Sequence, residues 1–337
     1  MRKYKKATAY LLILVLCLQI SLTDGEIRRV KVQTSGDWDY EVNEDGTATI
    51  TEYNGGESEV IIPAVLDGYK VTSIGYGAFK DCSSLTSISI PNNVTSIGSF
   101  AFKDCSSLTK INIPNSVTSI GWYAFEGTKW LDNKKAENSF VIINGILIDG
   151  HECKGMVNIP EGVTSIENDT FLGCIGLTSI NIPSSVTNIG YSAFVYCSKL
   201  TSINIPNSVT SIGSYVFANC NELESISIPN GITNLYGTFY NCSKLESISI
   251  PNSVTSIGYD TFFGTKWLDN KRAIDPCVVV NGILIDGYEC KGMVDIPDTV
   301  TSIADSAFEE CRGLESINIP NSVRVSVKVH FRDATKI

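Results

Sequence analysis

The chain has 337 residues and a net charge of −10, from 36 acidic and 26 basic side chains. Such an acidic surface repels phosphate backbones, and no basic cluster offsets the repulsion, so nucleic acid is excluded as a partner. The length alone suggests two compact domains. However, Gly, Ser, Asn, Thr and Ile recur in the same short phrases, which indicates internal repeats instead.

Residues 1–25 have the pattern of a secretory signal. Basic residues near the start precede an apolar run at 11–20, which is too short to span a bilayer comfortably, and polar residues follow it at once. We expect cleavage near Gly25 and therefore a secreted or cell-surface protein. An uncleaved membrane anchor is the alternative, and membrane contact is expected through this segment only.

Residues 26–60 are expected to form an N-terminal β cap. Between residues 40 and 53, two alternating runs flank the turn sequence NEDGT. The acidic residues of this segment alternate with Trp38, Tyr40 and Val42 and lack the late bidentate glutamate of a calcium loop. We therefore predict strands here rather than a metal site.

A phrase of about 23 residues then recurs in register. Residues 85–107 read LTSISIPNNVTSIGSFAFKDCSS, and residues 200–222 read LTSINIPNSVTSIGSYVFANCNE. The array covers residues 61–322 in about eleven coils, and one coil lacks a residue between Leu235 and Phe239. We predict a repeat solenoid, mostly β, in which parallel strands alternate with short 3-10 or irregular turns on the convex side.

The apolar positions predict the course of one coil. Leu85, Ile88 and Ile90 point inward from a short strand, and Val94 and Ile97 form a second inward pair. One coil cannot bury this stripe alone. Stacked coils bury it continuously, at a spacing of about 4.8 Å.

An aromatic position recurs at the back of the coil and predicts a ladder of stacked rings. Two rungs lack an aromatic residue, and we expect Ile148 and Ile285 to fill them. The rungs are Phe79, Phe102, Phe125, Phe171, Phe194, Phe217, Phe239, Phe262 and Phe308.

A cysteine position also recurs. Stacked cysteines point in parallel, which is poor disulfide geometry, so we expect a ladder of buried free thiols. Three cysteines lie off this ladder, and of these Cys277 and Cys290 are a candidate pair, with Cys153 as the third. The ladder consists of Cys82, Cys105, Cys174, Cys197, Cys220, Cys242 and Cys311.

Two stretches depart from the repeat and match each other. Residues 128–160 nearly recur at 265–297, an offset of 137 residues that indicates a duplicated six-coil block. Each copy carries Asn-Gly and Asp-Gly pairs between apolar runs, which are hairpin-turn signals. We predict variant coils at 128–153 and 265–290, with a small hairpin at one edge.

Residues 323–337 are expected to form a C-terminal β cap. Apolar and polar or basic residues alternate strictly over 323–332. Outward basic side chains on such a strand would protect the exposed edge of the stack from further pairing.

The phrase L-x-x-I-x-I-P-x-S-V-T-S-I-G-x-x-A-F-x-x-C closely resembles the BspA-like (treponemal-type) leucine-rich repeat. The resemblance covers about four-fifths of the chain in an unbroken register. It implies a leucine-rich-repeat solenoid in a secreted or cell-surface protein. It also implies a role of the kind linked to adhesion, to binding of matrix or host proteins, and to co-aggregation.

Catalysis has little support in the sequence. His151 and His330 are the only histidines, no GxSxG motif accompanies them, and neither a phosphate-binding glycine loop nor Cys-x-x-Cys is present. We therefore expect no enzyme activity, no cofactor and no metal site.

The exposed strand positions carry short polar side chains. Stacking makes them columns on the inner strand face, where hydroxyl and amide groups lose little entropy on binding. Solvated repeat surface is the competing interpretation. Trp130 and Trp267 are candidate aromatic hot spots, with core packing as the favoured alternative. The polar positions are Thr86, Ser87, Ser89, Lys110, Asn112, Thr178, Ser179, Asn181, Thr201, Ser202 and Asn204, followed in later coils by Glu224 and Glu246.

The sequence thus favours a binding module, and its assignment as an adhesin rests on family analogy. Its expected ligand is an extracellular protein or glycan. A structural spacer of the cell surface is the alternative, and regular, uninterrupted polar columns would favour it.

Overall fold

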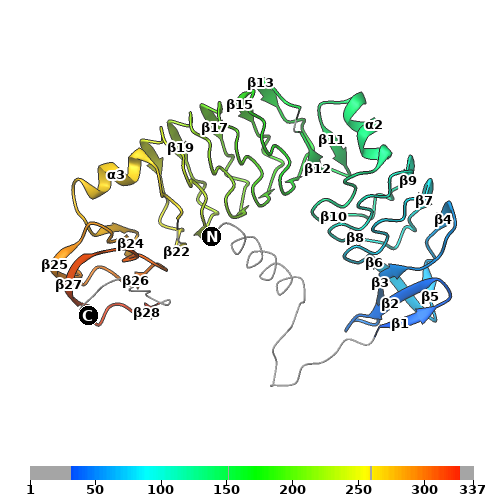
Figure 1. Cartoon of the computed structure of the whole chain (residues 1–337), viewed down its shortest axis with the longest axis horizontal. Helices are drawn as coiled ribbons and strands as arrows, with labels where there is room; N and C mark the ends of the chain where they lie inside the picture. Colours follow the sequence, from blue (N-terminus) through cyan, green and yellow to red (C-terminus); the bar gives the residue numbers. More distant parts are fainter. Residues whose placement is uncertain (1–31, 151, 259, 327–337) are drawn as a thin grey trace.

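The computed structural model describes residues 32–150, 152–258 and 260–326. The predicted signal and most of the predicted C-terminal cap lie outside these residues. The described coils stack into a long arch, with parallel strands in successive coils (Figure 1). The predicted fold class, a mostly β repeat solenoid with turns between parallel strands, is confirmed.

An antiparallel meander closes the N-terminal end of the arch. It consists of β1 (Gln33–Ser35), β2 (Trp38–Val42) and β3 (Thr47–Tyr53). β3 then pairs in parallel with β6 (Tyr69–Ile74), and β5 (Val65–Leu66) pairs with the same strand. The parallel stack therefore begins on the last strand of the meander.

Most coils contribute two strands, which stack into two columns. The column of longer strands follows the outer rim of the arch in Figure 1 and contains β4 (Glu59–Ile61), β7 (Ser87–Ser89), β9 (Lys110–Asn112), β13 (Gly155–Asn158), β15 (Leu177–Asn181), β17 (Ser202–Asn204), β19 (Ser225–Ser227), β21 (Ser247–Ser249), β25 (Lys291–Asp295) and β27 (Gly313–Asn318). The column of mostly two-residue strands follows the inner rim and contains β6, β8 (Ser96–Ile97), β10 (Ser119–Ile120), β12 (Ile146–Asp149), β14 (Ser165–Ile166), β16 (Asn188–Ile189), β18 (Ser211–Ile212), β20 (Asn234–Leu235), β22 (Ser256–Ile257), β24 (Ile283–Asp286), β26 (Ser302–Ile303) and β28 (Val325–Ser326).

The polar columns therefore lie on the outer face of the arch, and our placement of them on an inner face is wrong. The expectation of turns on the convex side is wrong for the same reason, because a strand column lies there. Two features explain the curvature. Helices occupy the outer column at the variant coils (Figure 1), and a helix is wider than a strand. On the inner side, glycines let neighbouring backbones approach closely: a Cβ on Gly98 would lie 2.6 Å from the carbonyl carbon of Gly75.

Each variant coil begins with a helix that the sequence analysis missed. Helices α2 (Lys129–Glu137) and α3 (Lys266–Arg272) replace a strand of the outer column. Thr128 and Thr265 cap them, each hydroxyl accepting a hydrogen bond from the backbone N–H three residues later at 3.2 Å. The Trp130 N–H donates to the Leu108 carbonyl at 2.8 Å, which fixes α2 onto the preceding coil.

A hairpin follows each helix, as the Asn-Gly pairs predict. β11 (Val141–Ile143) pairs with β12, and β23 (Val278–Val280) pairs with β24. Asn144 has φ = 50° and Gly145 has φ = 82°. Two successive positive φ angles are typical of the two-residue turn that joins twisted antiparallel strands.

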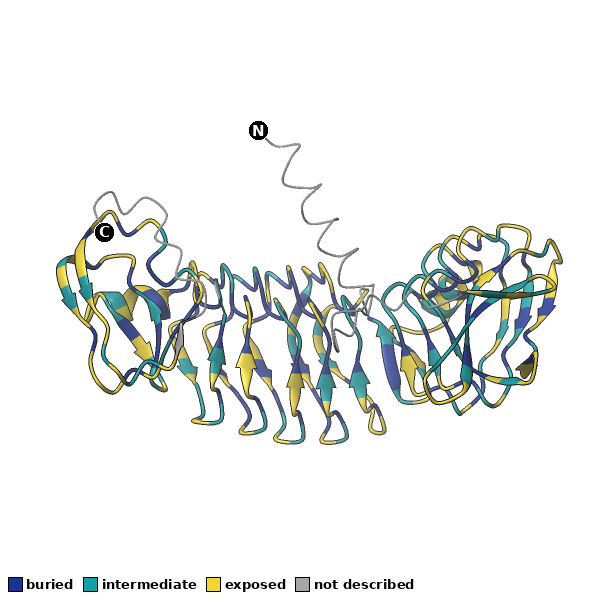
Figure 2. Ribbon diagram, turned by 90° about the horizontal axis from the view of Figure 1, so that it is seen from below, coloured by how far each residue is buried: buried dark blue, intermediate teal, exposed yellow. Residues whose placement is uncertain are grey.

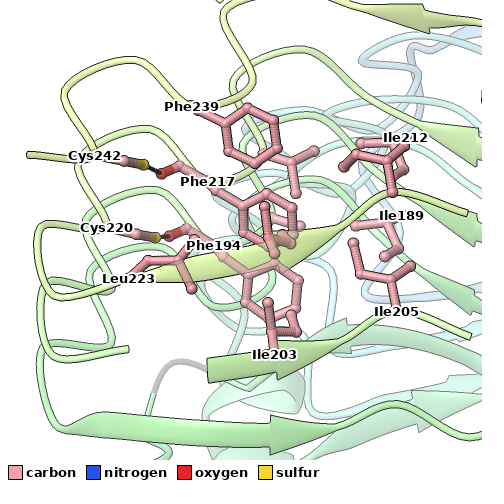
Figure 3. Packing of buried hydrophobic residues seen from close by; sticks show 14 of the residues in the cluster. Ile189, Phe194, Ile203, Ile205, Ile212, Phe217, Cys220, Leu223, Phe239 and Cys242 are labelled. Carbon is pink, nitrogen blue, oxygen red and sulfur yellow. Dashed lines mark hydrogen bonds between the residues drawn. The ribbon is translucent and has the colours of Figure 1, made fainter. Parts of the chain in front are cut away.

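The aromatic ladder forms the core behind the strands (Figure 3). Successive rings stack with centroids 5.0 Å apart for Phe171 and Phe194 and 5.5 Å apart for Phe194 and Phe217. The turns that carry these rings are bonded between coils as well: the Phe171 N–H donates to the Ala193 carbonyl at 2.8 Å. Successive coils are therefore linked by backbone bonds on the turn side as well as along both strand columns.

Isoleucines do not fill the skipped rungs, which corrects our expectation for Ile148 and Ile285. The Gly150 N–H donates to the Thr170 carbonyl, the bond that a rung residue makes, and the Gly287 N–H does the same with Ala307. A Cβ on Gly150 would lie 2.5 Å from the ring of Phe171. The variant coils place a glycine there because the next ring already occupies the space.

The cysteine ladder consists of free thiols, as predicted. The thiols of Cys105, Cys197, Cys220 and Cys242 each donate to the carbonyl of a phenylalanine in an earlier coil, as Cys220 does with Phe194 at 3.2 Å (Figure 3). Burial raises the pKa of Cys220 and raises that of Cys242 to about 12. These thiols are therefore unreactive fillers.

The second variant coil contains the disulfide for which the sequence offered a candidate pair. Cys277 and Cys290 are joined, with their Cα atoms 6.3 Å apart. In the first variant coil Cys153 is free and buried.

Candidate binding surface

The outer columns bring the polar candidate residues into register. Ser87 faces Lys110 and Ser89 faces Asn112 in neighbouring coils. The Asn112 amide donates to the Ser89 hydroxyl at 3.4 Å. The Thr109 hydroxyl donates a hydrogen bond to the backbone carbonyl of Thr86 at 3.3 Å.

A second group of candidates lies on the central strands. Ser179 faces Ser202, and Asn181 faces Asn204, with alternate positions buried beneath them. Thr178 and Thr201 stand at the start of the same strands and are bonded to each other through the Thr201 hydroxyl and the Thr178 carbonyl at 3.1 Å. Figure 2 shows how exposed and buried segments alternate along these coils.

Glutamates continue this group toward α3. Glu224 and Glu246 are exposed in adjacent coils, and the Glu246 N–H donates to the Glu224 carbonyl at 3.0 Å. The Lys266 ammonium lies 2.7 Å from a Glu246 carboxylate oxygen, and its hydrogen bond lowers the pKa of Glu246. Exposed pairs of this kind contribute little stability, so they mainly set the local charge.

The helices divide the polar columns into separate groups. α2 follows β9, and the column resumes only at β13; α3 follows β21, and it resumes at β25. The candidate positions on β7 and β9 are thus brought together in one group and those on β15, β17 and the following strands in another. They do not form one continuous platform.

A hollow of about 420 Å³ lies where the first group meets α2. Its floor is the strand face of β7 and β9, and its wall is the side of the helix. The residues that line it are Ser87, Ile88, Ser89, Thr109, Lys110, Ile111, Asn112, Trp130, Asn133, Lys134 and Glu137.

Both candidate tryptophans pack into the core, the alternative that the sequence favoured. Trp130 is 8% exposed, with its ring centroid 4.9 Å from that of Phe125. Trp267 is 7% exposed and lies 4.5 Å from Phe262 in the same way. Each tryptophan ends a run of stacked phenylalanines beneath its helix, and only Trp130 reaches the hollow.

A second, smaller hollow of about 260 Å³ opens at the first variant coil, on the side of the turns. We call it the notch. Trp122 and Tyr123 reach across it to a coil more than forty residues later: the indole Nε1–H and the phenol hydroxyl both donate to Oδ2 of Asp169, at 2.7 and 2.9 Å. Glu167 and Lys135 also line it.

The Glu167 and Asp169 carboxylates of the notch are half-buried. Burial raises the pKa of Asp169 although hydrogen bonds from Tyr123 and Trp122 oppose the shift. Burial also raises the pKa of Glu167, against the Ser165 hydrogen bond. The sequence analysis missed the pairing of Trp122 and Tyr123 with Asp169, because the contact spans coils that the repeat register keeps apart.

Metal chemistry has no arranged site in the described part of the chain. No group of three or more His, Cys, Asp or Glu side chains there is placed to hold a metal ion. His151 and His330 lie outside the described residues. Among residues 32–150, 152–258 and 260–326, no helix is long and apolar enough to cross a bilayer.

The geometry defines a leucine-rich-repeat solenoid built from short parallel strands. The family model for the BspA type leucine rich repeat region matches residues 65–147, 151–269 and 288–337, with six copies. These matches cover more than half of the sequence, so the chain belongs to the BspA-type leucine-rich-repeat family.

Solved structures include similar proteins. A leucine rich repeat protein of T. pallidum is 28% identical, with 72% of this chain and 94% of that chain covered and a TM-score of 0.31. A leucine rich cell surface protein of Faecalibacterium prausnitzii is 27% identical, with 85% and 94% covered and a TM-score of 0.36. A search of curated proteins finds no match.

Proposed function

We propose that the protein is an extracellular binding module, an adhesin, that holds a protein or glycan ligand in the hollow beside α2. The observation that carries the proposal is the convergence of short polar side chains, in register on hydrogen-bonded strands, against the wall of a helix. The backbone holds these groups in place, so little entropy is lost on binding.

The hollow also differs from its counterpart in the duplicated block. Lys110 corresponds to Ser247 and Glu137 to Ile274, at the offset of 137 residues. Lys134, whose ammonium lies 3.2 Å from the Glu137 carboxylate, adds a second cation to this rim. Two cations on an otherwise acidic protein favour a ligand that offers carboxylates or hydroxyls.

A spacer without a ligand is the competing function. Regular, uninterrupted polar columns would support it, whereas α2 and α3 interrupt them here. Family membership and the predicted signal at residues 1–25 support a location outside the cell, secreted or at the cell surface.

The test is binding of the purified protein to arrays of extracellular-matrix proteins and glycans, with Lys110→Glu as the variant and Ser247→Glu as its matched control beside α3. We expect Lys110→Glu to weaken binding at least about fivefold, the effect of losing one central contact, and Ser247→Glu to leave it unchanged. If the wild-type protein bound no array at high concentration, the adhesin proposal would be contradicted. Equal losses of binding in the two variants would also contradict it.

A further inference from the structure

A row of aromatic rings runs along the turn side of the arch, just beyond the inner strands. We call it the aromatic row. Each ring contacts the next, with centroids 5.4, 5.7, 6.4 and 6.1 Å apart in order along the row. Its members are Tyr76, Phe100, Trp122, Tyr191 and Tyr215.

Packing of the core does not require this row. The core has its own ladder of buried phenylalanines. Tyr76 is 58% exposed, Tyr191 44% and Tyr215 37%. Contiguous exposed apolar surface on a water-soluble repeat is a feature of interaction sites.

Two of these rings are held at a cost in backbone energy. Phe100 has φ = 59° and Tyr215 has φ = 57°. At the same place other coils have Gly77 or Gly237, which adopt this conformation without penalty, or non-glycine residues that also have positive φ: Tyr123, Asp169, Ser192, Asp260 and Ser306. The conformation therefore belongs to the repeat, and a bulky residue in it costs about 1 kcal/mol or more.

The notch supplies polar groups in the middle of the row. Trp122 belongs to both features, since its ring contacts Tyr191 and its Nε1–H is bonded to Asp169. The duplicated block has Ala304 in place of Glu167 and Ser306 in place of Asp169. Glu167 and Asp169 therefore have no counterparts beside the second variant coil.

We propose that the aromatic row binds an extended, neutral polysaccharide chain, with the notch carboxylates accepting hydrogen bonds from its hydroxyls. The face of an aromatic ring is electron-rich and attracts the weakly positive C–H groups on the face of a sugar ring. The path through the ring centroids from Tyr76 to Tyr215 is about 24 Å long. That length suits a polymer rather than a single sugar.

Charge selects a neutral chain. The protein carries −10 overall, and Asp149, Glu167 and Asp169 all line the notch. An anionic polysaccharide would be repelled there, whereas uncharged hydroxyls are good donors to carboxylates. This site is separate from the hollow beside α2, so it goes beyond the proposed outer-face adhesion.

The experiment is titration calorimetry of the full secreted chain with neutral hexasaccharides (cello-, chito-, laminari- and xylohexaose) and their disaccharides, with oligogalacturonate as the anionic probe. We expect at least one neutral hexasaccharide to bind at least about tenfold more tightly than its disaccharide, because several rings are engaged at once. No neutral binding at millimolar concentration, or binding of oligogalacturonate alone, would overturn the proposal.

Variants locate the site. The double variant Tyr191→Ala, Tyr215→Ala should weaken hexasaccharide binding at least about tenfold, since each ring is an exposed contact. The control is Tyr196→Ala: Tyr196 is 56% exposed, has φ = 61° and lies at the other end of the same turn as Tyr191. An equal loss of hexasaccharide binding in the control, or no loss in the double variant, would refute binding at the aromatic row. Lys110→Glu should retain binding, which separates this site from the hollow.

Discussion

The two variant coils share one backbone plan but are held together differently. In the second, the disulfide between Cys277 and Cys290 joins the segment after α3 to the segment that follows the hairpin. Arg272 on α3 donates two hydrogen bonds to the Asp286 carboxylate, at 2.8 and 2.6 Å. A covalent link and a two-pronged ion pair thus fix helix and hairpin together.

The first variant coil uses packing at the same places. Phe140 stands where the second coil has Cys277, and its ring meets that of Phe171 edge-on at 6.3 Å. Cys153 is a free thiol, and Lys135 makes an ion pair with Asp149 at 3.0 Å.

The difference teaches that closing the coil does not depend on the groups that line the notch. Both coils keep the helix cap, the Asn-Gly turn and the glycine under the ring. Only the first combines these with Trp122, Glu167 and Asp169, and it does so without a covalent link. Four pairs of substitutions, from the largest expected effect to the smallest, test this comparison.

Removing the ring next to each glycine rung should cost most. Phe171 is fully buried, and Phe171→Ala should lower stability by about 3–5 kcal/mol. Phe308→Ala should cost a similar amount, but the disulfide should confine the damage. Hydrogen exchange should therefore show lost protection over more coils around Phe171 than around Phe308. Equal spread in both variants would contradict the comparison.

Breaking the covalent link should cost somewhat less. The disulfide closes a sequence separation of 13 residues, and for such a loop Cys277→Ser should lose about 3 kcal/mol. Cys153→Ser, at the equivalent place in the first coil, should lose less than about 1 kcal/mol because only a thiol is exchanged for a hydroxyl. Urea unfolding under oxidising conditions measures both. Matching losses would mean that the link contributes nothing.

Replacing the cation of each variant coil, Arg272 by lysine and Lys135 by arginine, should change stability less. Arg272→Lys removes one of two parallel hydrogen bonds from side chains that are 16% and 15% exposed, at a cost of about 1 kcal/mol. Lys135→Arg should leave stability unchanged or raise it slightly, because a fork replaces a single contact. A stability gain from Arg272→Lys, measured by the same unfolding curves, would contradict the role of the fork.

The smallest effect concerns pH. Burial raises the pKa of Glu167 in the folded state, so the folded chain binds this proton more tightly than the unfolded chain. The resulting stabilisation is complete below the ordinary carboxyl pKa and is lost as pH rises through the raised value. Glu167→Gln should therefore reduce the fall in Tm over that window, with Ala304→Gln in the second block as the control. An unchanged slope in Glu167→Gln would rule out this contribution.

Periodicity predicted which apolar positions are buried in each coil. Ile88, Phe102 and Cys105 are buried as their spacing indicated, because stacking leaves a periodic apolar residue no other partner. The same reasoning placed Ile148 at a rung that Gly150 occupies, since the variant coil shifts the chain and the count of 23 no longer applies.

Features that depend on contacts between coils could not be predicted from the sequence pattern of a single coil. α2 carried local signals, with Thr128 as its cap, Asp132 in the first turn and lysines in the last, but the strand pattern around it concealed them. Which rim is the outer one depends on the width of the helices. The bond between Trp122 and Asp169 depends on the notch that the variant coil leaves.

The backbone bonds that join each coil to the next, along both strand columns and the turn ladder, make the coil an interchangeable part. Segments as alike as residues 128–160 and 265–297 indicate that a whole block has been repeated in register. Because a gained or lost block meets the same surface at both ends, no new interface has to arise. The length of the arch can thus change by whole blocks, while the end strands and the surface groups of each block are kept.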